Sequence, residues 1–272
     1  MIAIRKGQVN SGKCCSLMDA HFSGSFYRLF VIIFGLMILL SDPVKSQEAE
    51  GGDAEVETFI NKADAIYGVD DELINGYPYR PPQDLIQFHP YYGRESWQRG
   101  TLYMNGETFR NKRLKYDLVE DAMILKADLQ DGVTKLIHLN SLHVDSVRLG
   151  NHLFVHSRKY YPSDSIETYY QEVFAKNDGA LALIIHHSKK FHSQYTELAP
   201  KGRFSNVNTE RMLIRNGKTY KVSHRRSFLK IFEKEKRRKL RKFMNRKDIR
   251  YRKASTKQLD ELMKFCSSKL MM

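Results

Sequence analysis

The chain has 272 residues, of which 42% are hydrophobic and 28% charged, so a folded protein with a substantial core is expected and wholesale disorder is excluded. Its three cysteines exclude a scaffold that depends on several disulfides. The formal net charge is +14, and it is concentrated at one end, because residues 221–269 hold 19 Lys and Arg against 5 Asp and Glu while the preceding residues are neutral overall.

An apolar run near the N-terminus predicts export. Residues 29–40 (LFVIIFGLMILL) follow Arg28 and are all apolar or glycine. A transmembrane helix needs about 20 such residues, whereas the core of a secretory signal needs about 7–15. We therefore expect residues 1–46 to be a signal peptide with a long n-region, cleaved after Ser46. Two alternatives stay open: translation that starts at Met18, and an uncleaved membrane anchor.

Residues 47–68 follow this signal. The segment starts with small and acidic residues, QEAEGGDAE, which have nothing to bury. Val56, Phe59, Ile60 and Ala63 then recur at helical spacing, and Gly68 is placed to end a helix. We predict an acidic leader and a short amphipathic helix. Cleavage of the signal would leave Cys266 as the only cysteine, so no disulfide within the chain is expected.

The next segment, up to residue 97, is rich in proline and aromatic residues. Four prolines exclude long regular elements there. The aromatic side chains suggest either a contact surface for sugars or peptides, or a cover over the edge or end of a β core; the second interpretation is favoured. The candidates for the contact surface are Tyr77, Tyr79, Tyr91, Tyr92 and Trp97.

Five hairpin signals indicate an antiparallel β domain over residues 69–222. Each consists of two apolar or alternating stretches around a turn, and the turns lie at residues 105–106, 131–132, 150–151, 177–179 and 216–217. We predict a mainly β fold of about ten short strands, arranged as a sandwich or an open barrel. Alternation over residues 114–118 indicates a half-buried strand, with Lys115 and Asp117 on its outer face.

The C-terminal segment, residues 223–272, predicts two basic helices. Ser223 is placed to cap a helix that carries Phe228, Phe232 and Phe243 on a narrow apolar stripe. A break around residues 245–254 precedes a second helix, which begins at Ser255 with Gln258 at the capping-box position. The apolar stripes should pack on the β domain.

Three segments together resemble an uncharacterised family of exported, β-rich proteins found mainly in Bacteroidota. They are residues 74–81 (INGYPYRP), residues 89–125, which start HPYYGRESWQRGTLYMNGETF, and residues 217–232 (GKTYKVSHRRSFLKIF) ahead of a basic helical end. The resemblance covers roughly residues 74–265. It implies a location in the periplasm or cell envelope of a Gram-negative cell, and it supplies no catalytic residues.

The sequence contains no nucleophile elbow, no phosphate-binding glycine loop and no zinc-protease motif, and no cofactor is expected. Histidine is the reactive residue in surplus. His152 and His156 share one face of a predicted strand and could hold a metal ion together with His138 or His143 on a neighbouring strand. Solvent-facing histidines on hairpins are the favoured interpretation.

The basic end should attract phosphates or carboxylates in a salt-dependent way. Export would favour anionic lipid, lipopolysaccharide or an acidic glycan as the partner, or an envelope protein, and would make nucleic acid an unlikely one. A solvated helix that only aids docking and solubility is the alternative. The candidate contact residues are Lys234, Lys236, Arg237, Arg238, Lys239, Arg241 and Lys242.

These features favour an exported, non-enzymatic binding or structural module of the cell envelope. An envelope hydrolase or metal-dependent enzyme that uses the sheet histidines is the first alternative. A nucleic-acid-binding protein is the second, and it requires that the apolar run does not direct export.

Overall fold

The computed structural model describes residues 71–82, 85–129, 132–163, 167–176, 180–193, 197 and 199–269. The predicted signal peptide, acidic leader and N-terminal amphipathic helix lie outside the described residues.

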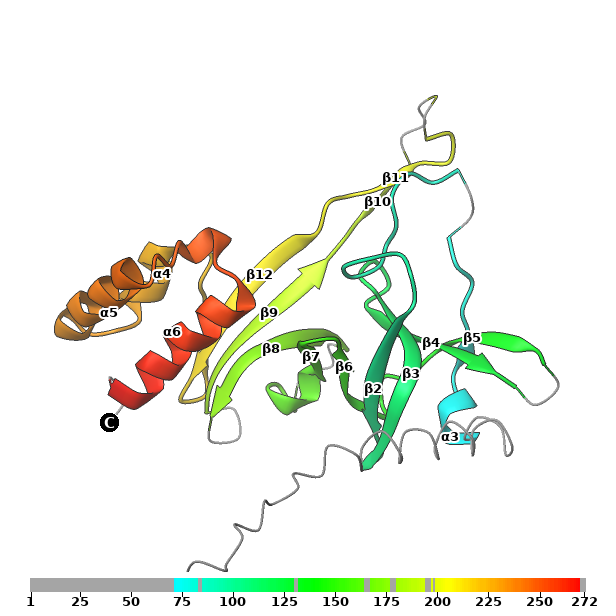
Figure 1. Cartoon of the computed structure of the whole chain (residues 1–272), viewed down its shortest axis with the longest axis horizontal. Coiled ribbons are helices and arrows are strands. Elements are labelled where there is room, and N and C mark those ends of the chain that lie inside the picture. The colour runs from blue at the N-terminus through cyan, green and yellow to red at the C-terminus, as the bar shows by residue number, and fades with distance from the viewer. Residues whose placement is uncertain are drawn as a thin grey trace, which may run out of the picture. The chain divides into compact units, whose positions relative to one another are not determined.

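The described part of the chain is mainly β, as predicted. Eleven strands form one open antiparallel sheet in the order β1-β5-β4-β3-β2-β6-β7-β8-β9-β12-β13, and β10 and β11 form a separate pair (Figure 1). The strands are β1 (Tyr77–Pro78), β2 (Gln98–Met104), β3 (Glu107–Asp117), β4 (Ala122–Asp128), β5 (Thr134–His138), β6 (Val144–Leu149), β7 (His152–His156), β8 (Tyr169–Lys176), β9 (Leu181–Ser188), β10 (Phe191–His192), β11 (Arg203–Phe204), β12 (Asn208–Arg215) and β13 (Lys218–Lys221).

All five predicted hairpins are present: β2–β3, β4–β5, β6–β7, β8–β9 and β12–β13 pair as antiparallel neighbours. Two of them turn on an Asn-Gly pair, because two-residue hairpin loops need positive φ at both central positions. Asn105 and Gly106 have φ of 50° and 80°, and Asn216 and Gly217 have φ of 49° and 71°. The stretch over residues 114–118 does not form a strand of its own, since Leu114 to Asp117 continue β3.

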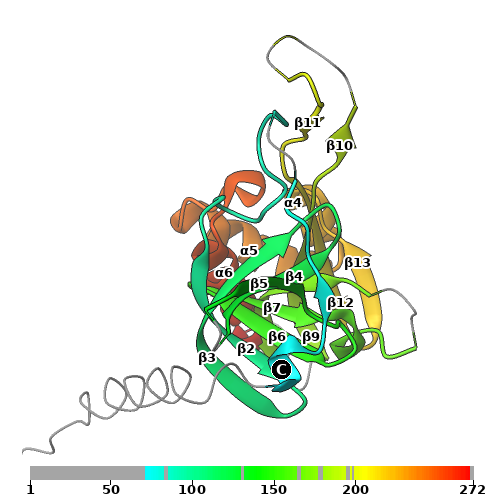
Figure 2. The same cartoon turned by 90° about the vertical axis from the view of Figure 1, so that its right-hand side faces the viewer.

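A first core lies against one face of the strands from β5 through β8 in sheet order. It contains Leu125 of β4, Leu102 of β2, Phe154 of β7 and Tyr169 of β8, all almost fully buried. Because β4 and β8 share this core although four strands separate them in the sheet, the sheet must curve strongly, as Figure 2 shows. The helix α3 (Asp71–Ile74) adds Leu73 to the same core.

A second core joins β8, β9 and β12 to three C-terminal helices, which lie beside these strands in Figure 1. The helices are α4 (Arg225–Lys230), α5 (Lys234–Arg246) and α6 (Thr256–Lys269). Leu183 and Leu213 of the sheet and Leu259 and Leu262 of α6 are at most 1% exposed in this core. The apolar stripes of the helices therefore pack on the β domain, as the sequence predicts.

The first predicted helix is wrong in two respects. It begins after His224 rather than Ser223, and the backbone N–H of His224 donates to the hydroxyl of Ser227. It also breaks between α4 and α5, where the Arg237 side chain donates to backbone carbonyls at the end of α4 and just beyond it. Such side-chain donors satisfy the carbonyls that a helix leaves unpaired at its C-terminus.

The capping box at the start of α6 is confirmed. The Ser255 hydroxyl accepts the backbone N–H of Gln258 at 3.2 Å, and the Gln258 side chain accepts the backbone N–H of Ser255 at 3.0 Å. This reciprocal pair satisfies two donors at the start of the helix.

Candidate functional site

A hollow of about 460 Å³ opens between α4 and α5 at the basic end of the chain. Five of its six lining residues are cationic, and among the described residues that line it none is acidic. The lining residues are Arg225, Arg226, Leu229, Lys230, Arg237 and Arg241. The site is therefore a concentration of positive charge, with one aliphatic side chain in its wall.

Two of the arginines are held in place by neutral acceptors. Arg237 donates from Nε to the carbonyl of Phe232 at 2.7 Å and from Nη2 to the carbonyl of Lys230 at 3.2 Å. Arg225 donates to the side-chain oxygen of Asn245 at 2.8 Å. These bonds orient the guanidinium groups without neutralising their charge, so both remain available to attract an anion.

The other three cations are exposed. The charged groups of Arg226, Lys230 and Arg241 form no hydrogen bond or ion pair with any described residue, and only the backbone carbonyls of Lys230 and Arg241 accept bonds from other side chains. Arg226 and Lys230 are four residues apart along the chain, as are Arg237 and Arg241. Residues at this spacing lie on one side of a helix, so the like charges repel one another within each pair.

The predicted basic residues all lie on α5, but they differ in their surroundings. Arg237 and Arg241 line the hollow. Lys236 is 3.8 Å from Glu233, so part of its charge is matched. Lys234, Arg238, Lys239 and Lys242 are exposed on the same helix.

The sequence analysis missed the contribution of α4 to this site, namely Arg225, Arg226 and Lys230. The i,i+4 spacing of Arg226 and Lys230 was a usable signal for a shared face. No signal in the sequence shows that this face lies opposite α5, because that position depends on the break between the two helices.

The proline-rich segment covers the second face of β3, β4 and β5. Tyr79, Tyr91 and Trp97 pack with Ile124 and other side chains of these strands in a small cluster. The sequence analysis favoured a cover over the β core, but it expected an edge or an end, whereas these side chains cover a face of the strands. Of the remaining aromatic candidates, Tyr77 is 67% exposed, whereas Tyr92 packs elsewhere against Phe154 and two histidines.

The covered face corrects the expectation that Lys115 and Asp117 point to solvent. Asp117 is 2% exposed and accepts the Tyr79 hydroxyl at 2.7 Å. The Lys115 ammonium lies 3.9 Å from the centre of the Tyr91 ring and 4.6 Å from that of Trp97, and burial lowers its pKa. Alternation predicted one solvated face, but the preceding segment folds over that face.

The structure does not bring the three candidate metal ligands together. His138 is in β5, and four strands separate it from β7, which carries His152 and His156. Among the described residues, no group of three or more His, Cys, Asp or Glu could hold a metal ion. The expectation that His138 lies on a strand next to β7 is wrong, because β5 pairs with β1 and β4 whereas β7 pairs with β6 and β8.

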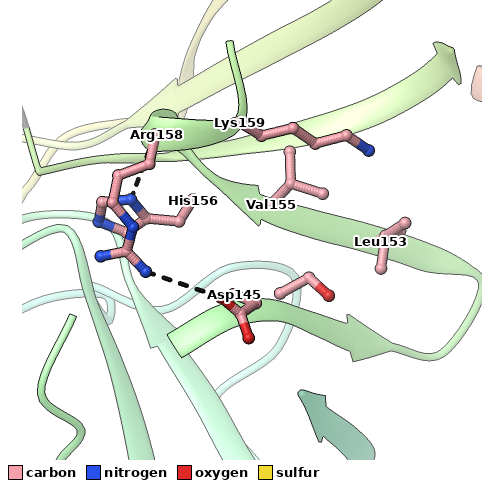
Figure 3. A pocket seen from close by; sticks show the side chains of 7 residues that line it. Asp145, Leu153, Val155, His156, Arg158 and Lys159 are labelled. Atoms are coloured by element: carbon pink, nitrogen blue, oxygen red, sulfur yellow. Dashed lines mark hydrogen bonds and ion pairs between the residues drawn. The ribbon is translucent and has the colours of Figure 1, made fainter. Parts of the chain in front are cut away.

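His156 instead takes part in a local structural arrangement, shown in Figure 3. Its Nδ1 accepts the backbone N–H of Arg158 at 3.2 Å, at the start of a 3₁₀ turn. Arg158 is 3.8 Å from Asp145, and its guanidinium also donates to two backbone carbonyls. The hollow in Figure 3, of about 420 Å³, therefore contains paired charges, unlike the hollow between α4 and α5.

His152 and His187 are joined by a buried glutamine. The amide nitrogen of Gln171 lies 2.7 Å from Nδ1 of His152, and its oxygen lies 2.7 Å from Nε2 of His187. The amide nitrogen also donates to the hydroxyl of Thr256 in α6 at 3.3 Å. Gln171 lies between Tyr169 of the first core and Val173 of the second, so this network marks the boundary between the two cores.

Both histidines also line a hollow of about 550 Å³ together with Tyr92 and Arg94. Burial lowers the pKa of His187 to about 4 and lowers that of His152 as well. Both rings are therefore neutral at ordinary pH, and each can accept a proton only against the cost of burial. The sequence analysis did not associate these two histidines, since 34 positions separate them in the chain.

No protein-family model, no curated protein and no solved structure matches this chain. Within the part of the chain that the structure describes, no helix is long and apolar enough to cross a membrane.

Proposed function

We propose that this protein is an exported, non-enzymatic binding or structural module of the cell envelope, and that its basic helical end attaches it to an anionic surface. The observation that supports this most directly is the group of exposed, unpartnered cations on α4 and α5. Cations that are not neutralised within the described chain are free to attract external anions. Anionic lipid is the first candidate for that surface; lipopolysaccharide and acidic glycans share its charge.

The proposed location is the periplasm or the cell envelope, after cleavage near Ser46. It rests on the twelve-residue apolar run, which has the length of a signal core, and on the family resemblance. We also propose that the sheet is arranged as an open barrel rather than as a sandwich. The core that β4 and β8 share supports this arrangement.

Sedimentation with lipid vesicles tests the attachment. The protein, purified from cells that make the full-length chain, is mixed with vesicles of phosphatidylglycerol or of phosphatidylcholine. We expect it to sediment with the anionic vesicles in about 0.1 M salt and to be released in about 1 M salt, where the Debye length falls to about 3 Å. Equal binding to both lipids, or none to either, would count against the proposal.

A second candidate function is an envelope hydrolase or metal-dependent enzyme. The hollow that contains His152, His187 and Tyr92 favours it, because neutral imidazoles in a concave site can act as bases or metal ligands. Because no group of three or more metal ligands is found among the described residues, the metal-dependent form of this function needs a further ligand from outside them. It predicts zinc in stoichiometric amount in the purified protein, which elemental analysis measures. Loss of that zinc on substitution of His152 or His187 would locate the ion in this hollow.

A further inference from the structure

We propose that the hollow between α4 and α5 is a specific phosphate-binding pocket, and that its ligand is the headgroup phosphate of an anionic lipid. The inference deepens the proposed function and rests on it for the source of the phosphate. It differs from a general attraction between a basic helix and a membrane, because it assigns recognition to the five cations of one pocket: Arg225, Arg226, Lys230, Arg237 and Arg241.

The arrangement of charge around this pocket is costly without an anion. Like charges four residues apart on a helix repel one another and destabilise the helix. The pair Arg226 and Lys230 on α4 and the pair Arg237 and Arg241 on α5 line the same hollow, and none of its lining residues within the described chain is acidic. An anion in the hollow would relieve the repulsion within and between the pairs.

Two of the five groups are already oriented for binding. Arg237 and Arg225 are held by backbone and amide oxygens, so less side-chain freedom is lost when they contact a ligand. Arg226, Lys230 and Arg241 are exposed at the same hollow and can close on the ligand from the solvent side. The pocket therefore combines fixed and adjustable donors.

The donors match the chemistry of a phosphate. A guanidinium presents parallel N–H groups that fit two phosphate oxygens, and several cations around one hollow suit a group with more than one acceptor oxygen. None of the residues lining the hollow is aromatic, so it offers no ring on which a nucleic-acid base could stack. Its volume of about 460 Å³ accommodates a phosphate with part of a headgroup attached.

The surroundings favour a lipid as the source of the phosphate. Lys234, Arg238, Lys239 and Lys242 are exposed on α5 outside the hollow. A single small phosphate would leave these charges without a role. A surface with many headgroups would engage them at the same time as one headgroup fills the pocket.

The test compares two double variants of equal charge. R226Q/R241Q removes two pocket cations, whereas R238Q/R252Q removes two exposed arginines that do not line the pocket. None of the four guanidinium groups forms a hydrogen bond or ion pair with a described residue, so both variants should fold, which circular dichroism verifies. Binding of pyrophosphate is measured by calorimetry in about 0.15 M salt, where the Debye length of about 8 Å limits long-range effects.

We expect R226Q/R241Q to bind pyrophosphate at least about tenfold more weakly than the unsubstituted protein, because hydrogen bonds from charged donors are lost. R238Q/R252Q should stay within about twofold. On phosphatidylglycerol vesicles both variants lose some general attraction, and the pocket variant should lose about a further tenfold. Pyrophosphate should also compete with these vesicles for the unsubstituted protein.

Failure of the pocket inference and failure of the proposed function would give different results. If both variants weaken equally on pyrophosphate and on vesicles, the pocket inference is overturned while attachment to an anionic surface stands. If the unsubstituted protein binds pyrophosphate through the pocket but ignores the vesicles, the lipid source and the proposed function are both overturned.

Discussion

Burial sets the charge of individual side chains in this protein. The pKa values of His187 and Lys115 are lowered because burial disfavours their charged forms. Arg226 and Arg241, in contrast, lie exposed at the helical end. At the scale of single residues, burial therefore disfavours positive charge in the interior, whereas the helical end places its cations at the surface.

The low pKa of His187 predicts that the protein loses stability in mild acid. Its pKa falls from 6.5 in the unfolded chain to about 4 in the folded protein. The unfolded chain therefore binds the proton first, and stability falls as the pH decreases from about 6.5 to about 4. A shift of this size corresponds to about 3 kcal/mol. Urea denaturation across this range measures the loss.

The variant His187→Gln isolates this contribution. A glutamine side chain can still donate to the Gln171 oxygen but does not titrate. His89, His152 and His156 also have lowered pKa values, and all three are present in both proteins. The variant should therefore lose about 3 kcal/mol less than the unsubstituted protein between pH 7 and pH 4. Parallel losses would contradict the assignment to His187.

Asp117 is predicted to stabilise the fold rather than to perform chemistry. One of its oxygens accepts the backbone N–H groups of Val119 and Glu120, and the other accepts the Tyr79 hydroxyl. Asp117→Ala removes all three bonds at a site that is 2% exposed and should cost about 2–4 kcal/mol in the free energy of unfolding. Asp145→Ala, at an exposed ion pair, should cost less than about 1 kcal/mol. Similar costs for the two would refute the structural role.

At the scale of elements, local sequence signals predicted those parts of the structure that depend on local geometry. Asn-Gly pairs specify two-residue turns, so the β2–β3 and β12–β13 hairpins could be predicted from residues 105–106 and 216–217 alone. The break between α4 and α5 could not be predicted in this way. It depends on the packing of Phe228 and Phe232 in one core and on the side-chain bonds of Arg237.

The docking of α6 predicts that the helical end and the sheet unfold together. Leu262 is fully buried in the core that α6 shares with β8, β9 and β12, and Leu262→Ala should cost about 2–5 kcal/mol. Lys257→Ala, at an exposed position of α6, should change stability by less than about 0.5 kcal/mol. Urea unfolding followed by circular dichroism and by fluorescence of Trp97, the single tryptophan, measures both.

The two signals report on different elements, because Trp97 packs on the face of β3–β5 covered by the proline-rich segment. We expect Leu262→Ala to shift both transitions equally, since β8 contributes to both large cores. A shift of the helical signal alone would mean that α6 undocks independently of the sheet.

At the scale of the whole molecule, the location of the basic end along the chain was easier to predict than the order of the strands in the sheet. The count of Lys and Arg along the chain located the basic end, and the apolar stripes predicted that this end packs on the sheet. The sheet order was not accessible, because the pairing of β6 with β2 rather than β5 is a long-range choice with no local signal. The sheet order places four strands between His138 and His152, so the metal site that the sequence analysis considered as the less favoured interpretation is not assembled.

For the same reason, the candidate pocket could be predicted only in part from the sequence. Arg237 and Arg241 could be identified from the charge of α5, whereas their position opposite Arg226 and Lys230 depends on how two helices pack. The proposed account thus joins a feature of composition, the basic end, to a feature of tertiary structure, the hollow between α4 and α5.

Fractionation of cells that make the full-length protein tests the central claim, export followed by attachment to an anionic surface. We expect the protein in the membrane fraction of the envelope at low salt, and its release when that fraction is washed with about 1 M salt, where charges are screened over about 3 Å. Recovery in the cytosol, or as a freely soluble periplasmic protein at low salt, would contradict the account.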